Sequence, residues 1–392
     1  MTNTAAQDAA MLAAVRLWIK NEFPPSIPAP PPTPVPDPTP IPPVTPPPVS
    51  GLPDGSDKAP TGLPQLPTFF KSYPVRPPWQ VPGVDYRVGI NTGIVLKDPR
   101  KGGLPSGVNP FFAGNSSVNI SGSNVILDGW DFTGIQLLMG GNAGEHPTNI
   151  LVRNCLFAGV PGSPAVNMAW NNVGDVTIEY CEIRDKATNE GIINWAPASK
   201  ISKCTVRYCY IHDNPGDGCD WKLGGQITFL YNFVYNQALG GLSHLDQMVC
   251  GDGACDFQPF KVDYNFFLSQ AVIAAGNGTQ GQSFDGNYHS TAFISRGGSW
   301  SKNVYINRTT GPDPSACVTF GLRIETSLIQ TGTIWNIQDN YIDDTGGRSP
   351  RGFGWMFVRN THYGPNLGKA VLSGNIDLVT GQKPANWNLT VS

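Results

Sequence analysis

The chain lacks the features that mark membrane, nucleic-acid-binding and secreted proteins. No run of about 18 apolar residues occurs, so no transmembrane helix is predicted. Charged residues make up only 14% of the 392 residues and the net charge is −3, which gives no basic surface for nucleic acid. A secretory signal is also missing, because Asp8 interrupts the Ala-rich N-terminal run and Arg16 and Lys20 follow it. Export by the usual route is therefore unsupported, and we expect no membrane span and no nucleic-acid partner.

Cysteine patterns typical of metal or redox sites are absent as well. The 8 cysteines fit neither a zinc ribbon nor a redox pair, so we predict no metal held by cysteine. Cys155, Cys181 and Cys209 recur at one position of a repeated phrase, where a thiol behaves as a small apolar residue. We expect them to be buried and free, although stacked cysteines would also have the spacing for a disulfide.

A short phrase that recurs between residues 125 and 371 is the strongest pattern in the chain. It reads apolar, spacer, apolar, two spacers, a small polar or thiol residue, spacer, apolar, as in VTIEYCEI and ITFLYNFV. The first five gaps are 25, 26, 28, 23 and 33 residues, a period that indicates a solenoid of stacked coils. Each coil can bury its apolar face only against its neighbours. The aligned residues are Trp130, Cys155, Cys181, Cys209, Asn232, Asn265, Asn287, Asn303 and Asn340.

The asparagines of this column predict a ladder inside the solenoid. Strand pairing sets equivalent positions of adjacent coils about 4.8 Å apart, and at that distance each amide can both donate and accept a hydrogen bond. Asparagine also marks exposed turns, but a turn residue would not keep one register between apolar neighbours such as Phe229 and Val234. We therefore favour buried asparagines that stack along the column.

These phrases carry a resemblance to a known superfamily. VTIEYCEIRD and CTVRYCYIHDNPGDGCDWK resemble the right-handed parallel β-helix superfamily, which includes pectate lyases, polygalacturonases and phage tailspikes. The resemblance covers residues 85–392, is specific for the fold and is weak for the activity. It implies an all-β domain that forms a right-handed, single-stranded parallel β-helix. The gaps of 16 and 37 residues on either side of Asn303 break the period, so we expect one of those alignments to be wrong.

The chain before the β-helix has a different character. Residues 1–23 combine a capping-box pattern with an apolar stripe at helical spacing, which predicts one short α-helix. Such a helix is marginal alone in water, so its stripe needs a partner; a disordered tail is the alternative. Residues 24–48 contain 15 prolines, which favour an extended polyproline II spacer.

Aromatic residues near the end of this segment predict renewed order. Residues 24–84 are interpreted as a Pro-rich linker followed by a cap, because solenoids need their terminal coils covered. We expect the cap to cover the first coil. The aromatic residues that indicate it are Phe69, Phe70, Tyr73 and Trp79.

A second set of short strands lies between the ladder phrases, in AVNMAW, IINWA, CDWKL and LDQMV. Aligned, they place polar residues in one column at gaps of 27, 26 and 26 residues. Burying carboxylates in a dry core is costly, so this column should face solvent. Its members are Asn167, Asn194, Asp220 and Asp246. The candidate catalytic residues are therefore Asp220 and Asp246, with His244 and Lys222 nearby, and the candidate substrate-binding residues are Asn167, Trp170, Asn194, Asp217, Gln247 and Arg323.

The candidate chemistry follows from paired acids. Two carboxylates about 5 Å apart can supply an acid and a nucleophile for glycosidic cleavage. Residues 214–218 and 245–247 are similar to the Asn-Thr-Asp and Asp-Asp motifs of polygalacturonases, and residues 323–325 to Arg-Ile-Lys. However, Gln247 replaces an aspartate, Glu325 replaces the lysine, and no Gly-His-Gly follows.

A lyase is the second enzymatic interpretation. A pectate-lyase-like site would hold Ca²⁺ through Asp217, Asp220 and Asp246, with Lys222 or an arginine as base. No complete lyase motif is present. The loop that carries Asp217 also fits an ordinary Gly-rich surface turn. Whether the chain is a glycoside hydrolase, a polysaccharide lyase or no enzyme stays open, and no cofactor is predicted outside the lyase case.

The order of anchor, stiff spacer and β-helix resembles a phage or phage-like virion appendage of the tailspike kind. The resemblance implies a location on a virion or extracellular surface, a polysaccharide ligand, and docking to an assembly protein through residues 1–23. It also implies a homo-oligomer, usually a trimer. The alternatives are a structural decoration or adaptor protein without enzymatic activity, and a secreted pectate-lyase or polygalacturonase-like enzyme.

Overall fold

The computed structural model divides the chain into two units, Met1–Gly51 and Leu52–Ser392. All residues that the structure describes belong to the second unit. The helix expected within residues 1–23 and the Pro-rich residues 24–48 lie outside the described residues. The described residues are 66–112, 116–140, 142, 144–160, 164–168, 173–184, 193–194, 203–213, 219–221, 226–235, 248–250, 256–257, 259–269, 284–286, 294–295, 297–308, 322–325, 334–343, 345, 356–359 and 369–384.

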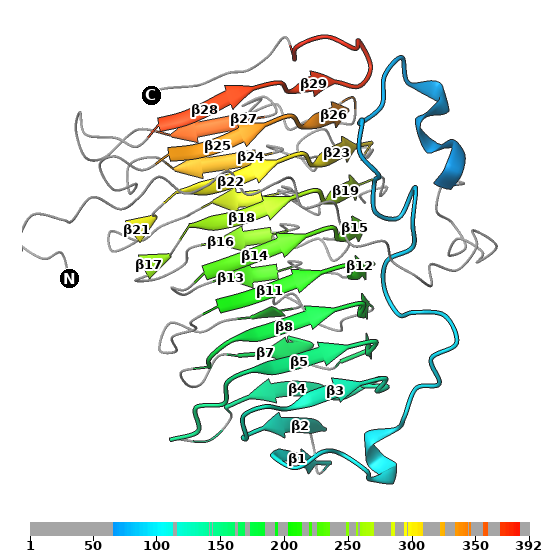
Figure 1. The fold of residues 1–392 in the computed structure, drawn as a ribbon, viewed down its shortest axis with the longest axis vertical. Helices are drawn as coiled ribbons and strands as arrows, with labels where there is room; N and C mark the ends of the chain where they lie inside the picture. The colour runs from blue at the N-terminus through cyan, green and yellow to red at the C-terminus, as the bar shows by residue number, and fades with distance from the viewer. Residues whose placement is uncertain are drawn as a thin grey trace, which may run out of the picture. The chain divides into compact units, whose positions relative to one another are not determined.

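Three long sheets, parallel except at one edge, carry nearly all the strands (Figure 1). The nine-stranded sheet contains β3 (Ile126–Asp128), β5 (Ile150–Arg153), β8 (Val176–Glu179), β11 (Lys203–Arg207), β14 (Gln226–Leu230), β18 (Phe260–Asp263), β22 (Gly298–Ser301), β25 (Ile334–Gln338) and β28 (Lys369–Ser373). The eight-stranded sheet contains β6 (Leu156–Ala158), β9 (Glu182–Arg184), β12 (Tyr210–His212), β15 (Phe233–Tyr235), β19 (Phe266–Ser269), β23 (Val304–Asn307), β26 (Tyr341–Asp343) and β29 (Ile376–Asp377). The ten-stranded sheet contains β1 (Val108–Phe111), β2 (Ser117–Ile120), β4 (Gln136–Met139), β7 (Val166–Asn167), β10 (Ile193–Asn194), β13 (Cys219–Trp221), β16 (Met248–Cys250), β20 (Phe284–Gly286), β24 (Leu322–Glu325) and β27 (Met356–Arg359).

The chain visits the three sheets in a fixed order, and each round is one coil. For example, β8, β9 and β10 are followed by β11, β12 and β13, and each strand pairs in parallel with its counterpart in the next coil. Two strands outside this order, β17 (Asp256–Phe257) and β21 (Ile294–Ser295), pair only with each other among the described strands. The predicted all-β parallel β-helix is confirmed.

The first edge of the ten-stranded sheet is closed by an antiparallel strand. β1 pairs with β2 in the only antiparallel register among the described strands. Pro110 lies inside β1 and has no backbone N–H to offer a further strand. Proline on an edge strand discourages edge-to-edge association.

Alternation along each strand creates a narrow core inside the coils. In β11 the buried Cys204 and Val206 alternate with the exposed or partly exposed Lys203, Thr205 and Arg207. The same pattern in the other strands brings Val, Ile, Leu and Phe side chains together in one continuous cluster. At about 25 cal/mol for each Å² of apolar surface removed from water, this column is the main favourable contribution to folding.

The predicted ladder occupies the turn between the nine-stranded and eight-stranded sheets. Asn232 and Asn265 are 0% and 1% exposed, and the Asn232 Nδ2 donates to Asn265 Oδ1 at 3.1 Å. Each amide also donates to a carbonyl of the preceding coil, such as Asn265 to Phe229 at 2.9 Å. In the early coils the Cys155, Cys181 and Cys209 thiols take the same position, buried and free.

The ladder ends differently from the sequence prediction. The backbone N–H of Asn265 donates to Asn303 Oδ1 at 2.8 Å, so Asn303 directly follows Asn265 in the ladder. Asn287 was therefore assigned to the ladder wrongly: it follows β20, a strand of the ten-stranded sheet. Asn340 in turn donates to Asn375 at 2.7 Å, a ladder member that the prediction missed.

The residue before each ladder position has a left-handed backbone. Its φ is 52° at Tyr180 and 60° at Tyr264. This conformation is costly for a side chain with Cβ. The tyrosine rings at these positions stack on one another between adjacent coils. The ring centroids of Tyr180 and Tyr208 lie 5.0 Å apart, and those of Tyr208 and Tyr231 lie 5.2 Å apart.

A segment that we call the strap, residues 66–97, runs along the outer face of the eight-stranded sheet (Figure 1). It starts in the 3₁₀-helix η1 (Leu66–Ser72) and is followed by a second one, η2 (Pro99–Lys101). Its apolar residues form a second buried cluster with side chains of the sheet. The strap members of this cluster are Phe69, Phe70, Val81, Val84 and Val88.

We expected the aromatic residues at the start of the strap to cover the first coil, but they do not. Phe69 contacts Phe266 at a centroid distance of 5.3 Å, and Trp79 contacts Tyr341 at 5.3 Å. Both partners belong to later coils. Only the end of the strap reaches the first coil, where Lys97 forms a backbone bridge to Trp130.

Candidate functional site

The polar column predicted on the second set of strands lies on the ten-stranded sheet. Adjacent parallel strands pair Asn167 with Asn194, and Asn194 with Asp220. Asn167 is partly exposed between the buried Val166 and Met168, so its position belongs to the outer face. We call this register position the outer column. The predicted alignment of these three polar residues is confirmed.

The fourth predicted member does not belong to the outer column. β16 places Val249, and not Asp246, beside Asp220. The alignment assumed a coil of 26 residues here, whereas the chain returns to the sheet later and the register shifts accordingly. Asp220 therefore has no second carboxylate at the adjacent position of its column.

The outer column continues with charged residues beyond Val249. Val249 pairs with Asp285, and Asp285 pairs with Arg323. Arg323 was predicted as a ligand-binding residue from its motif, and the register brings it into the column of Asn167. Asp285 was missed because its phrase, QSFDGNYH, was taken for a ladder phrase although it forms β20.

The catalytic and substrate-binding roles of the predicted site residues stay predictions. Asn194, Asp220 and Arg323 are placed by their strands, and their side chains are not described. The remaining predicted site residues lie outside the described residues: His244, Lys222, Asp246, Trp170, Asp217 and Gln247.

A described cluster of charged side chains lies where the chain leaves the eight-stranded sheet for the ten-stranded sheet. His212, at the end of β12, is 7% exposed and has a carboxylate at each ring nitrogen. Nδ1 lies 2.8 Å from Asp213 Oδ2, and Nε2 lies 3.4 Å from Glu182 Oε1. Arg184 Nε binds the same Glu182 oxygen at 2.9 Å.

These contacts shift the pKa values of His212 and Glu182 toward their charged forms. Burial alone would lower the pKa of His212, but hydrogen bonds and charges from Asp213 and Glu182 raise it overall. Burial alone would raise the pKa of Glu182, but the hydrogen bond and charge of His212, together with Arg184, lower it overall. With a carboxylate at each ring nitrogen, His212 is suited to holding the cluster together.

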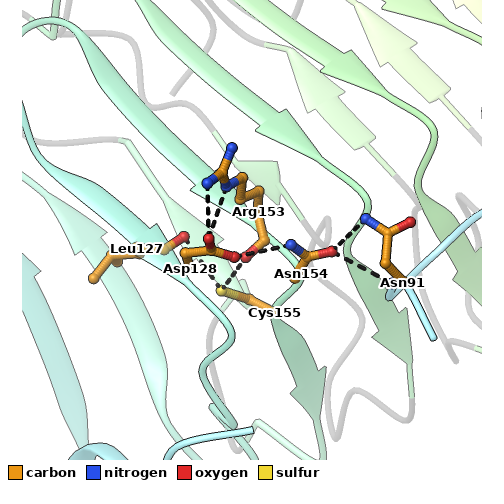
Figure 2. Close-up of polar contacts among 6 residues, drawn as sticks. All are labelled: Asn91, Leu127, Asp128, Arg153, Asn154 and Cys155. Atoms are coloured by element: carbon orange, nitrogen blue, oxygen red, sulfur yellow. Dashed lines mark hydrogen bonds and ion pairs between the residues drawn. The ribbon is translucent and has the colours of Figure 1, made fainter. Parts of the chain in front are cut away.

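The nine-stranded sheet carries a column of ion pairs on its outer face. Arg153 binds Asp128 at 2.8 Å. Asn154 donates to Asp128 and accepts from Asn91 of the strap (Figure 2). Burial alone would raise the pKa of Asp128, but these donors lower it. With both side chains partly exposed, such a pair contributes little to stability.

The arrangement of the ion pairs repeats further along the same sheet. Arg207 binds Glu179 at 2.6 Å. The arginines of this face are thereby engaged with neighbouring carboxylates. The sequence signal for them was the alternation of Asp, Arg and Glu at the last strand position of successive phrases, which the search for paired acids passed over.

No further ligand site is evident among the described side chains. Within the described ranges, no group of three or more His, Cys, Asp or Glu side chains is placed to hold a metal ion. Of the helices that the structure describes, none is long and apolar enough to span a membrane. Comparison with protein-family models, with curated proteins and with solved structures finds no match to this chain.

Proposed function

We propose that the β-helix binds a linear polysaccharide along the outer column of the ten-stranded sheet. The observation that carries this proposal is the register Asn167, Asn194, Asp220, which sets hydrogen-bonding residues side by side on adjacent strands. Successive positions repeat about every 4.8 Å, across the strands and along the stack. Amides donate to and accept from sugar hydroxyls, carboxylates accept from them, and an extended polymer offers hydroxyls repeatedly.

The biological setting that fits this proposal is a phage or phage-like virion appendage. The predicted anchor in residues 1–23 and the Pro-rich spacer would dock the β-helix to an assembly protein. Assembly in the cytoplasm and presentation on a virion or extracellular surface belong to the same proposal, as does a homo-oligomer such as a trimer. A structural decoration protein with this fold would bind no glycan.

Cleavage is a second candidate function, favoured by one feature of the outer column. Asp220 and Asp285 are separated by Val249, which is two strand steps or about 9.5 Å between backbones. Carboxyl groups of inverting glycosidases stand about 6.5–9.5 Å apart, whereas those of retaining enzymes are closer. If the carboxyl groups keep the separation of their backbones, a hydrolase built on these two acids would invert the anomeric configuration.

The test is a binding and cleavage assay on a panel of neutral and acidic polysaccharides. We expect saturable binding of at least one polymer by the full chain, weakened in Asp220→Asn. Reducing ends released without ultraviolet absorbance would identify a hydrolase. Reducing ends released together with the ultraviolet absorbance of unsaturated products would identify a lyase. Absence of binding to every polysaccharide of the panel would contradict the proposal and favour a structural protein.

A further inference from the structure

The strap connects coils that the solenoid itself keeps apart. In a solenoid each coil contacts only its neighbours, so stability is a sum of nearest-neighbour terms and parts of the stack can unfold separately. Tyr73 of the strap bonds to Asp343, a residue 270 positions later in the chain. Asn91 near the other end bonds to Asn154, in an early coil.

The N-terminal end of the strap is held by a polar lock. The Tyr73 hydroxyl donates to Asp343 Oδ2 at 2.5 Å and accepts from Arg308 Nη2 at 2.5 Å. Arg308 Nε also donates to Asp343 at 3.3 Å. The Asp343 side chain is only 2% exposed, and hydrogen bonds to charged groups in such surroundings are strong. These three residues join the strap just after η1 to the end of β23 and to β26.

The middle of the strap is held by close packing. Val81 is 0% exposed within the second apolar cluster. Gly83 lies so close to Phe233 that a Cβ there would stand 2.5 Å from the ring. Gly89 donates its backbone N–H to the Tyr208 carbonyl at 2.8 Å. The strap thus follows the coils in reverse order, from late to early.

The C-terminal end of the strap is tied to the first coils. Asn91 Nδ2 donates to Asn154 Oδ1 at 2.8 Å (Figure 2). Lys97 donates its backbone N–H to the Gly129 carbonyl at 2.8 Å, and its Nζ lies 4.5 Å from the centre of the Trp130 ring. Between these anchors, residues 92–95 are exposed.

We propose that the strap is a latch that makes the late and early coils unfold as one unit, with Tyr73, Asp343 and Arg308 as its closure. The proposed role of the latch is separate from glycan binding. Residues 1–65 join the strap at the closure end, so a pull exerted through them acts first on the Tyr73 contacts and not on the first coil.

Hydrogen exchange followed by mass spectrometry on the full chain tests the latch. The variants are Tyr73→Phe, which keeps the ring, and Asp343→Asn, with Lys71→Gln at an exposed strap position as control. We expect amides of the strap before Val81 and of β26 and β29 to exchange about tenfold faster in both lock variants. The strands β8 and β9, which lie far from the lock, should keep the wild-type rate, as should every peptide of the control.

Two outcomes would overturn the latch. If strap amides keep wild-type rates in Tyr73→Phe, the lock does not hold the strap. If strap amides exchange faster while β26 and β29 stay protected, the strap does not hold the late coils. If Asp343→Asn perturbs β26 directly, the result for Tyr73→Phe decides, because Tyr73→Phe removes only one hydroxyl from the strap.

Discussion

At the scale of single residues, the ladder is the most constrained part of the chain. Asn265 accepts from the backbone and side chain of Asn232 and donates to Phe229, Asp263 and Asn303. Asn265→Leu removes both functions at once and leaves buried partners unsatisfied. We expect a loss of about 1–3 kcal/mol in the free energy of unfolding, measured by urea denaturation.

The matched control for the ladder is an exposed asparagine. Asn109 of β1 is exposed, and its side chain donates to Ser121 Oγ at 2.7 Å. Asn109→Ala should change stability by no more than about 0.5 kcal/mol. Equal losses in the two variants would mean that the ladder position has no special role.

The His212 cluster predicts a dependence of stability on pH. Because the folded-state pKa of His212 is raised above its ordinary value of 6.5, its contribution is complete below that value. The contribution is lost as pH rises through the higher folded-state pKa. Wild-type protein should therefore lose more stability than His212→Gln between about pH 6 and about pH 9.

Urea midpoints of the two proteins at both pH values measure this difference. Glu182 behaves in the opposite sense, because its pKa is lowered and its contribution is lost only as the solution becomes acidic. It therefore does not interfere in the alkaline range. An identical pH response in wild type and His212→Gln would show that folding does not raise the pKa of His212.

Residue patterns predicted the ladder well and the outer column in part. Asn232 and Asn265 were found because each stands between apolar positions with a fixed spacing. Asn287 was a false match, because a Gly-Asn pair after a strand gives the same sequence pattern whichever sheet the strand belongs to. Asp246 was misplaced because equal gaps were assumed across a coil whose connection is longer. His212 was missed because one histidine at the end of an apolar phrase gives no signal of its carboxylate partners.

At the scale of elements, the strap depends on backbone positions that only glycine fills without cost. Gly83 has φ of 73° and a Cβ would contact Phe233 at 2.5 Å. Gly93 has φ of 77°, but nothing lies within 4 Å of its Cβ position. Gly93→Ala should cost about 1–2 kcal/mol for the left-handed backbone alone. Gly83→Ala should cost clearly more, because the ring must also move.

Thermal or urea unfolding of the two alanine variants separates strain from packing. Similar losses would mean that the strap has room to move away from Phe233 without penalty. The strap itself was only half predicted. Its aromatic residues indicated order, but single-sequence patterns cannot tell which coil a non-repetitive segment contacts. Some of its partners are distant in the sequence, such as Asp343, which lies 270 residues after Tyr73.

At the scale of the whole molecule, the N-terminal segment and the β-helix should be separable. Met1–Gly51 and Leu52–Ser392 are distinct units, and the strap lies in the second. Deleting residues 1–48 should leave a folded β-helix with unchanged circular dichroism and a cooperative melt, but one that no longer assembles onto its partner. Loss of the cooperative melt would show that the segment belongs to the core.

The most direct test of the central claim compares two outer positions on different sheets. Asn167→Ala alters the outer column of the ten-stranded sheet, and Thr205→Ala alters a partly exposed position of β11 on the nine-stranded sheet. Affinity for the polysaccharide found in the panel is measured for both, with melting temperatures as a check on folding. We predict that Asn167→Ala lowers affinity about tenfold while Thr205→Ala leaves it unchanged. An unchanged affinity in Asn167→Ala with a loss in Thr205→Ala would contradict the proposal and place the ligand on the other sheet.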